Sequence, residues 1–342
     1  MTSPGCAADQ PLSQPLSPAP SLTVRPGGDG SFSLWSESFG EGFHSGRGAL
    51  REARETFLRP SGLRPSGLEG RQPGRRLRVL EVCAGTCTNL ALLHEACASA
   101  AISLEWCGLE LDPHPLALAL AADSFRSPWR PQTLANLESL QRCGHWRQPG
   151  SSGRMLWGDG RRGVAELAES WSGTVDLIWH DAFSPQRCPQ LWSQDFLARL
   201  AALLAPRGRW ISYCSAAAVR ETLRGLGMGL GALAIPDPAP NPPLAVLDNA
   251  GSGVESRLVW SGGTVASPTA LGPDPLWREL TAMERDHLAC AAGEPYRDPD
   301  GMATAATILA QRLEAQARGC RCPSSAWRRR WGVERRGAGG VG

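Results

Sequence analysis

Residues 77–90 read LRVLEVCAGTCTNL, and this stretch decides the fold. LRVLEV has the length and pattern of a strand, and residues 89–101 have the composition of a helix. The turn between them contains Gly85, which lets the backbone approach a ligand closely. A strand, a glycine turn and a helix in this order predict the first βα unit of a parallel sheet.

The same alternation continues along the chain. Further strands are expected at residues 104–109, 155–157, 175–179, 209–213 and 256–260, and further helices at 115–123, 164–171, 192–204 and 216–225. Strands that alternate with helices at this spacing predict an α/β fold, in which helices cover both faces of a mostly parallel sheet.

Each of the first four strands ends at an acidic residue: Glu81, Glu110, Asp159 and Asp181. One explanation is that each acid caps the helix that follows it. The other is a ligand site, because ligands of such sheets bind outside the carboxyl ends of the strands. Four acids at one edge predict a pocket for a polyhydroxylated, cationic or amine-bearing ligand.

The first turn narrows the class of ligand. It lacks the three glycines that pass a pyrophosphate in dinucleotide-binding proteins, so an NAD-type oxidoreductase is disfavoured. S-adenosylmethionine fits, because it has no phosphate and carries a cationic amino acid end. Glu110 is expected to accept both ribose hydroxyls, and Asp159 the adenine amino group.

Several stretches carry a resemblance to a known family. The turn from Glu81 to Asn89 is similar to E-x-G-F-G-T-G-x-N, and Asp181, Phe183, Pro185, Pro189 and Trp192 follow a D-x-F-x-P…P-x-x-W pattern. Residues 42–52 and the Val219-Arg220 pair add to the likeness, which runs from about residue 29 to 230. The chain resembles the methyltransferase domain of the bacterial enzyme that makes 5-methylaminomethyl-2-thiouridine in tRNA. It departs from the pattern at Cys83 and Cys87, which replace glycines, and at Cys188, which replaces asparagine.

The resemblance implies a class I S-adenosylmethionine-dependent methyltransferase, Rossmann-like, with a seven-stranded sheet and a helical C-terminal extension. Asp181 is the expected catalytic residue. The expected cofactor-binding residues are Glu81, Gly85, Thr86, Asn89, Glu110 and Asp159. The expected substrate-binding residues are Phe43, His44, Glu52, Phe183, Pro185, Trp192 and Arg220. No cysteine and histidine pairs stand at zinc-ligand spacing, so no metal is expected.

The implied reaction is N-methylation of the aminomethyl group on C5 of the wobble (thio)uridine, with the anticodon loop of tRNA as the partner. The family's flavin oxidase domain has no counterpart here, so a separate enzyme is expected to supply the aminomethyl-uridine. Two alternatives stay open: an aminopropyltransferase-like enzyme acting on a small amine, and a non-catalytic methyltransferase-like fold that binds RNA or another partner. Cofactor binding separates the enzyme from the non-enzyme.

Composition sets the remaining expectations. The 342 residues have a net charge of +2, and all 35 basic residues are arginine. Eleven cysteines, an odd number, suit reduced thiols in a cytoplasmic protein, and no secretory signal or membrane span is expected. The expected divisions are a disordered tail at 1–28, a methyltransferase domain at 29–265, a helical extension at 266–318 and a basic flexible tail at 319–342. A monomer or weak dimer is expected.

Overall fold

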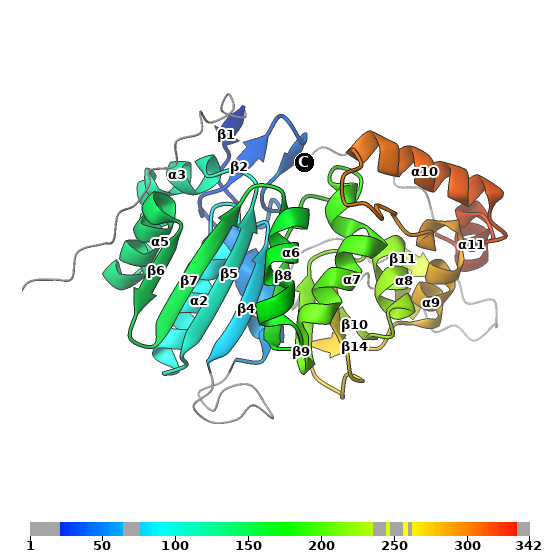
Figure 1. The fold of residues 1–342 in the computed structure, drawn as a ribbon. Coiled ribbons are helices and arrows are strands. Elements are labelled where there is room, and N and C mark those ends of the chain that lie inside the picture. The colour runs from blue at the N-terminus through cyan, green and yellow to red at the C-terminus, as the bar shows by residue number, and fades with distance from the viewer. Residues whose placement is uncertain (1–20, 64–75, 235–243, 247–255, 259–261, 334–342) are drawn as a thin grey trace, which may run out of the picture.

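A nine-stranded sheet forms the centre of the computed structural model, which describes residues 21–63, 76–234, 244–246, 256–258 and 262–333 (Figure 1). Its strands in order across the sheet are β14 (Trp277–Arg278), β10 (Gly229–Leu233), β13 (Thr264–Ser267), β9 (Leu204–Ser212), β8 (Val175–His180), β4 (Leu77–Val82), β5 (Leu104–Glu110), β7 (Ser151–Trp157) and β6 (His145–Gln148). The five strands from β9 to β7 are parallel, which agrees with the expected α/β class. Antiparallel strands extend both edges, so the described sheet has two strands more than the seven expected.

Helices cover both faces of this sheet. One face carries α2 (Thr88–Ser99), α3 (His114–Leu120), α4 (Asp123–Arg126) and α5 (Pro131–Cys143); the other carries α6 (Gly160–Trp171), α7 (Gln194–Leu203) and α8 (Ala217–Gly225). The side chains of β4 contribute to the hydrophobic cores on both faces of the sheet, because successive side chains on a strand point to opposite faces. Leu77 and Val79 join the core under α2 and α5, whereas Leu80 and Val82 join the core under α6 and α7.

The N-terminal segment lies against the first helical layer. It forms a small sheet of β1 (Leu22–Val24), β2 (Leu34–Ser36) and β3 (Glu41–Gly42), followed by α1 (Ala49–Glu52), the π-helix η1 (Ala53–Leu58) and the 3-10 helix η2 (Arg59–Ser61). Trp179 anchors this segment, since its ring packs against Phe57 at 5.8 Å and its Nε1 donates to Ser61 Oγ at 2.9 Å. Because β1 pairs with β2, the ordered domain begins before the expected boundary at residue 29.

The C-terminal region differs from two of the expected domain boundaries. β13 pairs with β9 and β10, so the boundary at 265/266 falls inside the central sheet. The helices α9 (Ala282–Ala289), η4 (Ala291–Gly293), α10 (Ala305–Arg318) and α11 (Ser324–Trp331) lie together beside α7 and α8 (Figure 1). In the expected flexible tail, the described residues 319–333 include α11, which is fixed in place because Trp327 is buried and its Nε1 donates to Met283 O at 3.1 Å.

Two short strands form a separate antiparallel sheet. β12 (Ser256–Leu258) coincides with the strand expected at 256–260, pairs with β11 (Leu244–Val246) outside the central sheet, and is followed by residues that lie outside the described ones. Across the described ranges, no helix has both the length and the apolar character needed to cross a bilayer.

Candidate active site

The first turn bends through three residues with positive φ. Cys83, Gly85 and Cys87 have φ angles of 62°, 52° and 60°. Two of the three therefore carry a Cβ in a left-handed conformation, which costs about 1 kcal/mol each. Gly85 is also tightly enclosed, because a Cβ there would lie 3.1 Å from Phe43 Cδ1. The turn consequently places bare backbone against the space in front of β4.

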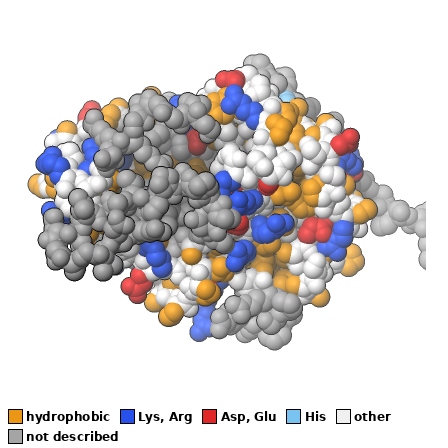
Figure 2. Space-filling view, turned by 180° about the vertical axis from the view of Figure 1, so that it is seen from behind, with side chains coloured by type: hydrophobic (Ala, Val, Ile, Leu, Met, Phe, Trp, Pro, Cys, Tyr) orange, Lys and Arg blue, Asp and Glu red, His pale blue; other side chains and the backbone are white. Residues whose placement is uncertain are grey.

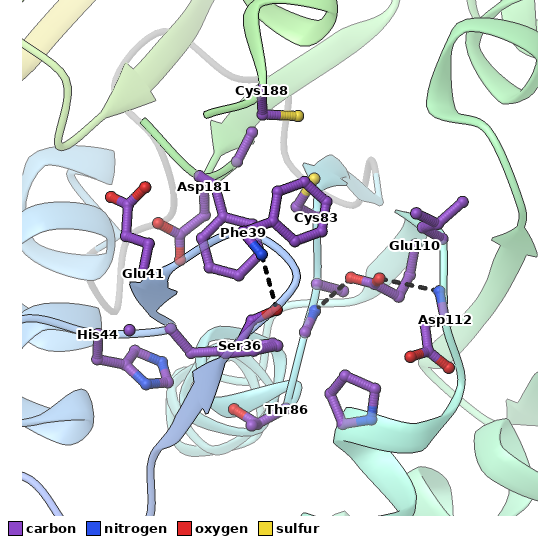
Figure 3. Close-up of a pocket in the computed structure, with 18 of the residues that line it drawn as sticks. Ser36, Phe39, Glu41, His44, Cys83, Thr86, Glu110, Asp112, Asp181 and Cys188 are labelled. Atoms are coloured by element: carbon purple, nitrogen blue, oxygen red, sulfur yellow. Dashed lines mark hydrogen bonds between the residues drawn. The ribbon is translucent and has the colours of Figure 1, made fainter. Parts of the chain in front are cut away.

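A cavity of about 530 Å³ opens at this turn, at the carboxyl ends of the parallel strands. Three segments enclose it: the first turn with the ends of β5, β7 and β8, the loop after β8, and the N-terminal β2–β3 region (Figure 3). Its lining includes ten residues that the sequence predicted as site residues: Phe43, His44, Glu52, Gly85, Thr86, Asn89, Glu110, Asp159, Asp181 and Phe183. The fold thus brings most of the expected set to one place.

Asp181 follows the end of β8 and lines the cavity. Its backbone N–H donates to Val82 O at 3.0 Å, and its Oδ2 accepts a hydrogen bond from Asn89 Nδ2 at 2.9 Å. Burial, together with the nearby charge of Glu52, raises the pKa of Asp181 to about 8. Such a carboxyl group exchanges a proton near neutral pH.

Glu110 ends β5 and holds the first turn. Its Oε2 accepts from the backbone N–H of Gly85 at 2.7 Å, and its Oε1 accepts from Asp112 N at 3.1 Å (Figure 3). Burial raises the pKa of Glu110 to about 7 in spite of these bonds. A carboxylate in this position has lone pairs left for the hydroxyls of a bound ligand.

Asp159 lines the cavity and also caps α6. Its Oδ1 accepts from Arg161 N at 2.9 Å, so this acid has the helix-capping role that is one explanation for acids at strand ends. The Arg161 guanidinium grips the same carboxylate, with Nη2 2.6 Å from Oδ2. Burial alone would raise the pKa of Asp159, but the bonds from Arg161 hold it below its ordinary value. Asp159 therefore enters the cavity as a carboxylate.

Three aromatic rings pack together in the lining of the cavity. Phe39 stacks on Phe183 with ring centroids 4.5 Å apart, and Phe43 meets Phe183 edge-on at 5.2 Å. Glu41 ties the N-terminal segment to the loop after β8, because its Oε2 accepts from both Ser184 N and Ser184 Oγ. His44 and Glu52 complete this side: Ser33 Oγ lies 2.9 Å from His44 Nδ1, and Glu52 Oε2 accepts from Ser45 N.

Four predicted site residues lie away from the cavity lining. Glu81 is fully buried and accepts from Trp106 Nε1 at 3.0 Å; burial raises its pKa to about 8. Pro185 is buried in the loop after β8. Trp192 is buried too, stacked on His180 at 4.2 Å, and its Nε1 donates to Phe183 O.

Arg220 is buried away from the cavity, which differs from its expected role. It is 2% exposed, its Nη1 lies 3.0 Å from Glu284 Oε1, and its Nε donates to Thr264 Oγ1. The expected substrate contact is wrong, since the guanidinium ties α8 to β13 and α9 inside the protein.

The cavity is also lined by four residues that the sequence did not predict as site residues: Phe39, Glu41, Tyr213 and Cys188. Glu41 stands one residue before the predicted Gly42–Ser45 motif, so only its long-range bond to Ser184 reveals its place. Tyr213 Oη donates to Ala182 O at 2.9 Å, beside Asp181. No group of three or more potential metal ligands occurs within the described part of the chain.

The comparisons with known proteins agree with this geometry. Residues 131–232 match a family described as S-adenosyl-L-methionine-dependent methyltransferase. A crystal structure of MnmC2 from Aquifex aeolicus superposes with a TM-score of 0.68 at 26% identity, covering 87% of this chain and 86% of that one. The chain is similar to MnmC2 in both sequence and fold. This confirms the expected fold class and S-adenosylmethionine as the cofactor of the family.

Two curated proteins show the extent of the MnmC likeness. The tRNA 5-methylaminomethyl-2-thiouridine biosynthesis bifunctional protein MnmC of Chromobacterium violaceum is 29% identical over 266 residues, 72% of this chain and 37% of its own length. An uncharacterised protein of Methanocaldococcus jannaschii is 28% identical over 205 residues, 58% of this chain and 52% of its own length. The chain thus spans about a third to a half of these relatives. The matches favour methyl transfer over the aminopropyltransferase alternative.

Proposed function

We propose that this protein transfers a methyl group from S-adenosylmethionine to the aminomethyl group on C5 of the wobble (thio)uridine of tRNA, giving 5-methylaminomethyl-(2-thio)uridine. One observation carries the proposal: Asp181, with a pKa of about 8, lines the cavity that opens at the first turn. An acid with this pKa suits an amine nucleophile, which must lose a proton to react. The MnmC relative is named for the same modified nucleoside.

The residues of the cavity fit S-adenosylmethionine. Gly85 supports this fit, because it lines the cavity and a Cβ there would meet the ring of Phe43, so glycine keeps the space between the first turn and that ring open. Glu110 would accept from the ribose hydroxyls and Asp159 from the adenine amino group, with Thr86 and Asn89 beside the methionine end. The carboxyl groups at the strand ends would offset the positive charge of the ligand. When bound, the cofactor supplies an electrophilic methyl group.

Asp181 does the chemical work in this proposal. Its carboxylate accepts a hydrogen from the substrate amine and so turns the nitrogen lone pair toward the methyl group. Bound S-adenosylmethionine would give its methyl group to this nitrogen and would leave as S-adenosylhomocysteine, and Asp181 would take the proton of the resulting ammonium. The same negative charge stabilises the ammonium as it develops. Phe39, Phe43 and Phe183 exclude water and offer faces on which a base stacks.

The anticodon loop of tRNA is the proposed partner. The wobble base is unpaired, so its entry into a cavity costs little. Figure 2 shows basic side chains, which are all arginine in this chain, gathered near the middle of one face. Such a group suits a polyanion. We further propose a cytoplasmic monomer or weak dimer that works after a separate enzyme has made the aminomethyl-uridine.

Nucleoside analysis of tRNA from a strain lacking this protein tests the function. We expect the unmethylated aminomethyl-uridine to accumulate and the methylated nucleoside to return when the gene is restored. Restoration with Glu105→Gln, an acid at the far end of β5 paired with Arg78, serves as the matched control. An unchanged nucleoside profile in the deletion strain would reject the proposed substrate. Calorimetry with S-adenosylmethionine separates the enzyme from a non-catalytic fold, which would show no binding at millimolar ligand.

A further inference from the structure

A segment of the C-terminal extension is linked to the cavity wall through Arg161 and Asp159. Residues 296–303, YRDPDGMA, join η4 to α10, and we call this segment the strap. It runs along the start of α7, where Gln194 N donates to Tyr296 O at 2.8 Å and Asp298 N donates to Asp195 Oδ2 at 2.7 Å. The strap therefore has a fixed place on the methyltransferase fold.

Asp298 stabilises the strap through hydrogen bonds inside the segment. Its Oδ1 accepts from the backbone N–H groups of Met302 and Ala303 at 3.1 and 3.0 Å, across a bend where Gly301 has a φ of 68°. The carboxylate is almost completely buried, with 1% of its side chain exposed. A buried carboxylate requires a positive partner, because an isolated buried charge is costly.

Arg161 is that partner, and it also holds Asp159. Its Nη1 lies 2.8 Å from Asp298 Oδ2 and donates to Ala303 O at 2.9 Å, while its Nη2 lies 2.6 Å from Asp159 Oδ2. The Arg161 side chain is 14% exposed and that of Asp298 is 1% exposed, so water screens the contact between these two side chains little. Two bonds from a planar guanidinium also fix the plane of the Asp159 carboxylate.

We infer that Asp298 is a positioning residue for cofactor binding, acting through Arg161 on Asp159. The chain of three charged side chains connects the strap to the cavity wall, so the C-terminal extension takes part in the site without lining it. The inference rests on the proposed contact between Asp159 and the adenine of the cofactor. If Asp298 has this role, the affinity for the cofactor depends on the strap as well as on the strand-end acids and the first turn.

The affinity of the full-length protein for S-adenosylhomocysteine, measured by calorimetry without tRNA, tests this inference. Asp298→Asn removes the charge that holds Arg161 and is expected to weaken binding roughly tenfold, the size of one charge-assisted hydrogen bond. Asp286→Asn is the matched control, because Asp286 pairs with Arg330 and Trp331 in the same extension, away from the cavity. We expect the control to bind within about twofold of the unsubstituted protein.

A double-mutant cycle tests whether Asp298 affects cofactor binding through Asp159. If Asp298 acts through Asp159, the loss of affinity in Asp159→Asn plus Asp298→Asn is smaller than the sum of the two single losses. Full additivity would overturn the inference, as would equal binding by Asp298→Asn and Asp286→Asn. Should Asp298→Asn fail to fold, Arg161→Lys keeps the charge but not the planar grip, and unchanged affinity in that variant contradicts the inference. Failure of tRNA methylation with normal binding would count against the proposed function alone.

Discussion

Asn89 Nδ2 donates a hydrogen bond to Asp181 Oδ2 at 2.9 Å and so joins the start of α2 to the residue after β8. The two residues are far apart in sequence, but β4 and β8 are neighbours in the sheet. Both line the cavity. The bond uses one oxygen of the carboxylate and sets its direction, so Asn89 orients the proposed catalytic acid.

Replacement of Asn89 is expected to affect turnover more than cofactor binding. Asn89→Ala removes a bond that lowers the pKa of Asp181, so the rise of kcat with pH should move to higher pH. We expect kcat near neutral pH to fall about tenfold, the effect of one hydrogen bond to a charged group. Steady-state kinetics across pH measures both effects. Asn136→Ala, a buried amide on α5 bonded to His94, controls for general loosening, and an unshifted pH profile in Asn89→Ala would contradict the role.

Stability should fall as the solution becomes alkaline. Burial raises the pKa of Glu81 from 4.5 to about 8, so the folded protein keeps a proton that the unfolded chain has lost. This contribution is complete below the unfolded pKa and disappears as pH rises through about 8. Thermal unfolding of the ligand-free protein is expected to show a lower Tm at about pH 9 than at about pH 6.

Two variants test whether Glu81 causes this dependence of Tm on pH. Glu81→Gln keeps an acceptor for Trp106 Nε1 but does not ionise, so its Tm should depend less on pH in this range. Glu105→Gln removes a partly exposed acid on β5 and should leave the slope unchanged. A Glu81→Gln protein with the full slope would show that Glu81 is ionised in the folded state.

Gly85 and Gly173 form a matched pair of left-handed glycines. Gly173 has a φ of 64° with open space around the position of a Cβ, whereas a Cβ on Gly85 would meet Phe43 at 3.1 Å. Gly173→Ala is expected to lower the free energy of unfolding by about 1 kcal/mol, and Gly85→Ala by about 2 kcal/mol. Urea denaturation measures both. Only Gly85→Ala should weaken cofactor binding, and equal affinities in the two variants would argue against a cofactor next to Gly85.

Cys83 tests the strain in the first turn directly. At a φ of 62°, glycine avoids a steric cost that any Cβ incurs. We therefore expect Cys83→Gly to be more stable than Cys83→Ala by about 1 kcal/mol, the reverse of the usual order. Urea denaturation of the two variants decides the point, since a more stable alanine variant would mean that the turn relaxes to negative φ.

Strand periodicity explains which acids the sequence placed correctly. Glu110, Asp159 and Asp181 stand at or just after strand ends, and the carboxyl ends of parallel strands share one edge, so the three line one cavity. Glu81 stands one residue before the end of β4. Because helices cover both faces of the sheet, a side chain inside β4 is buried whichever way it points, so Glu81 lies in the core against Trp106 although its sequence context resembles that of the other acids.

Other features depended on contacts that no local pattern reveals. Arg220 was predicted from a motif as a substrate contact, but its partner Glu284 lies 64 residues away and binds it inside the protein. The basic composition of residues 319–342 predicted a flexible tail, yet Trp327 is 3% exposed and packs with Met283. In both places tertiary packing outweighed the local composition.

Methyl transfer by the purified protein tests the central claim most directly. The substrate is tRNA with an aminomethyl-uridine at the wobble position, the methyl donor is S-adenosylmethionine, and the nucleosides are analysed by mass spectrometry. We predict conversion to the methylaminomethyl nucleoside, with Asp181→Asn slowed about 100-fold at unchanged affinity for S-adenosylhomocysteine and Glu105→Gln fully active. Near-normal turnover by Asp181→Asn, or no transfer by the unsubstituted protein while it binds the cofactor, would contradict the account.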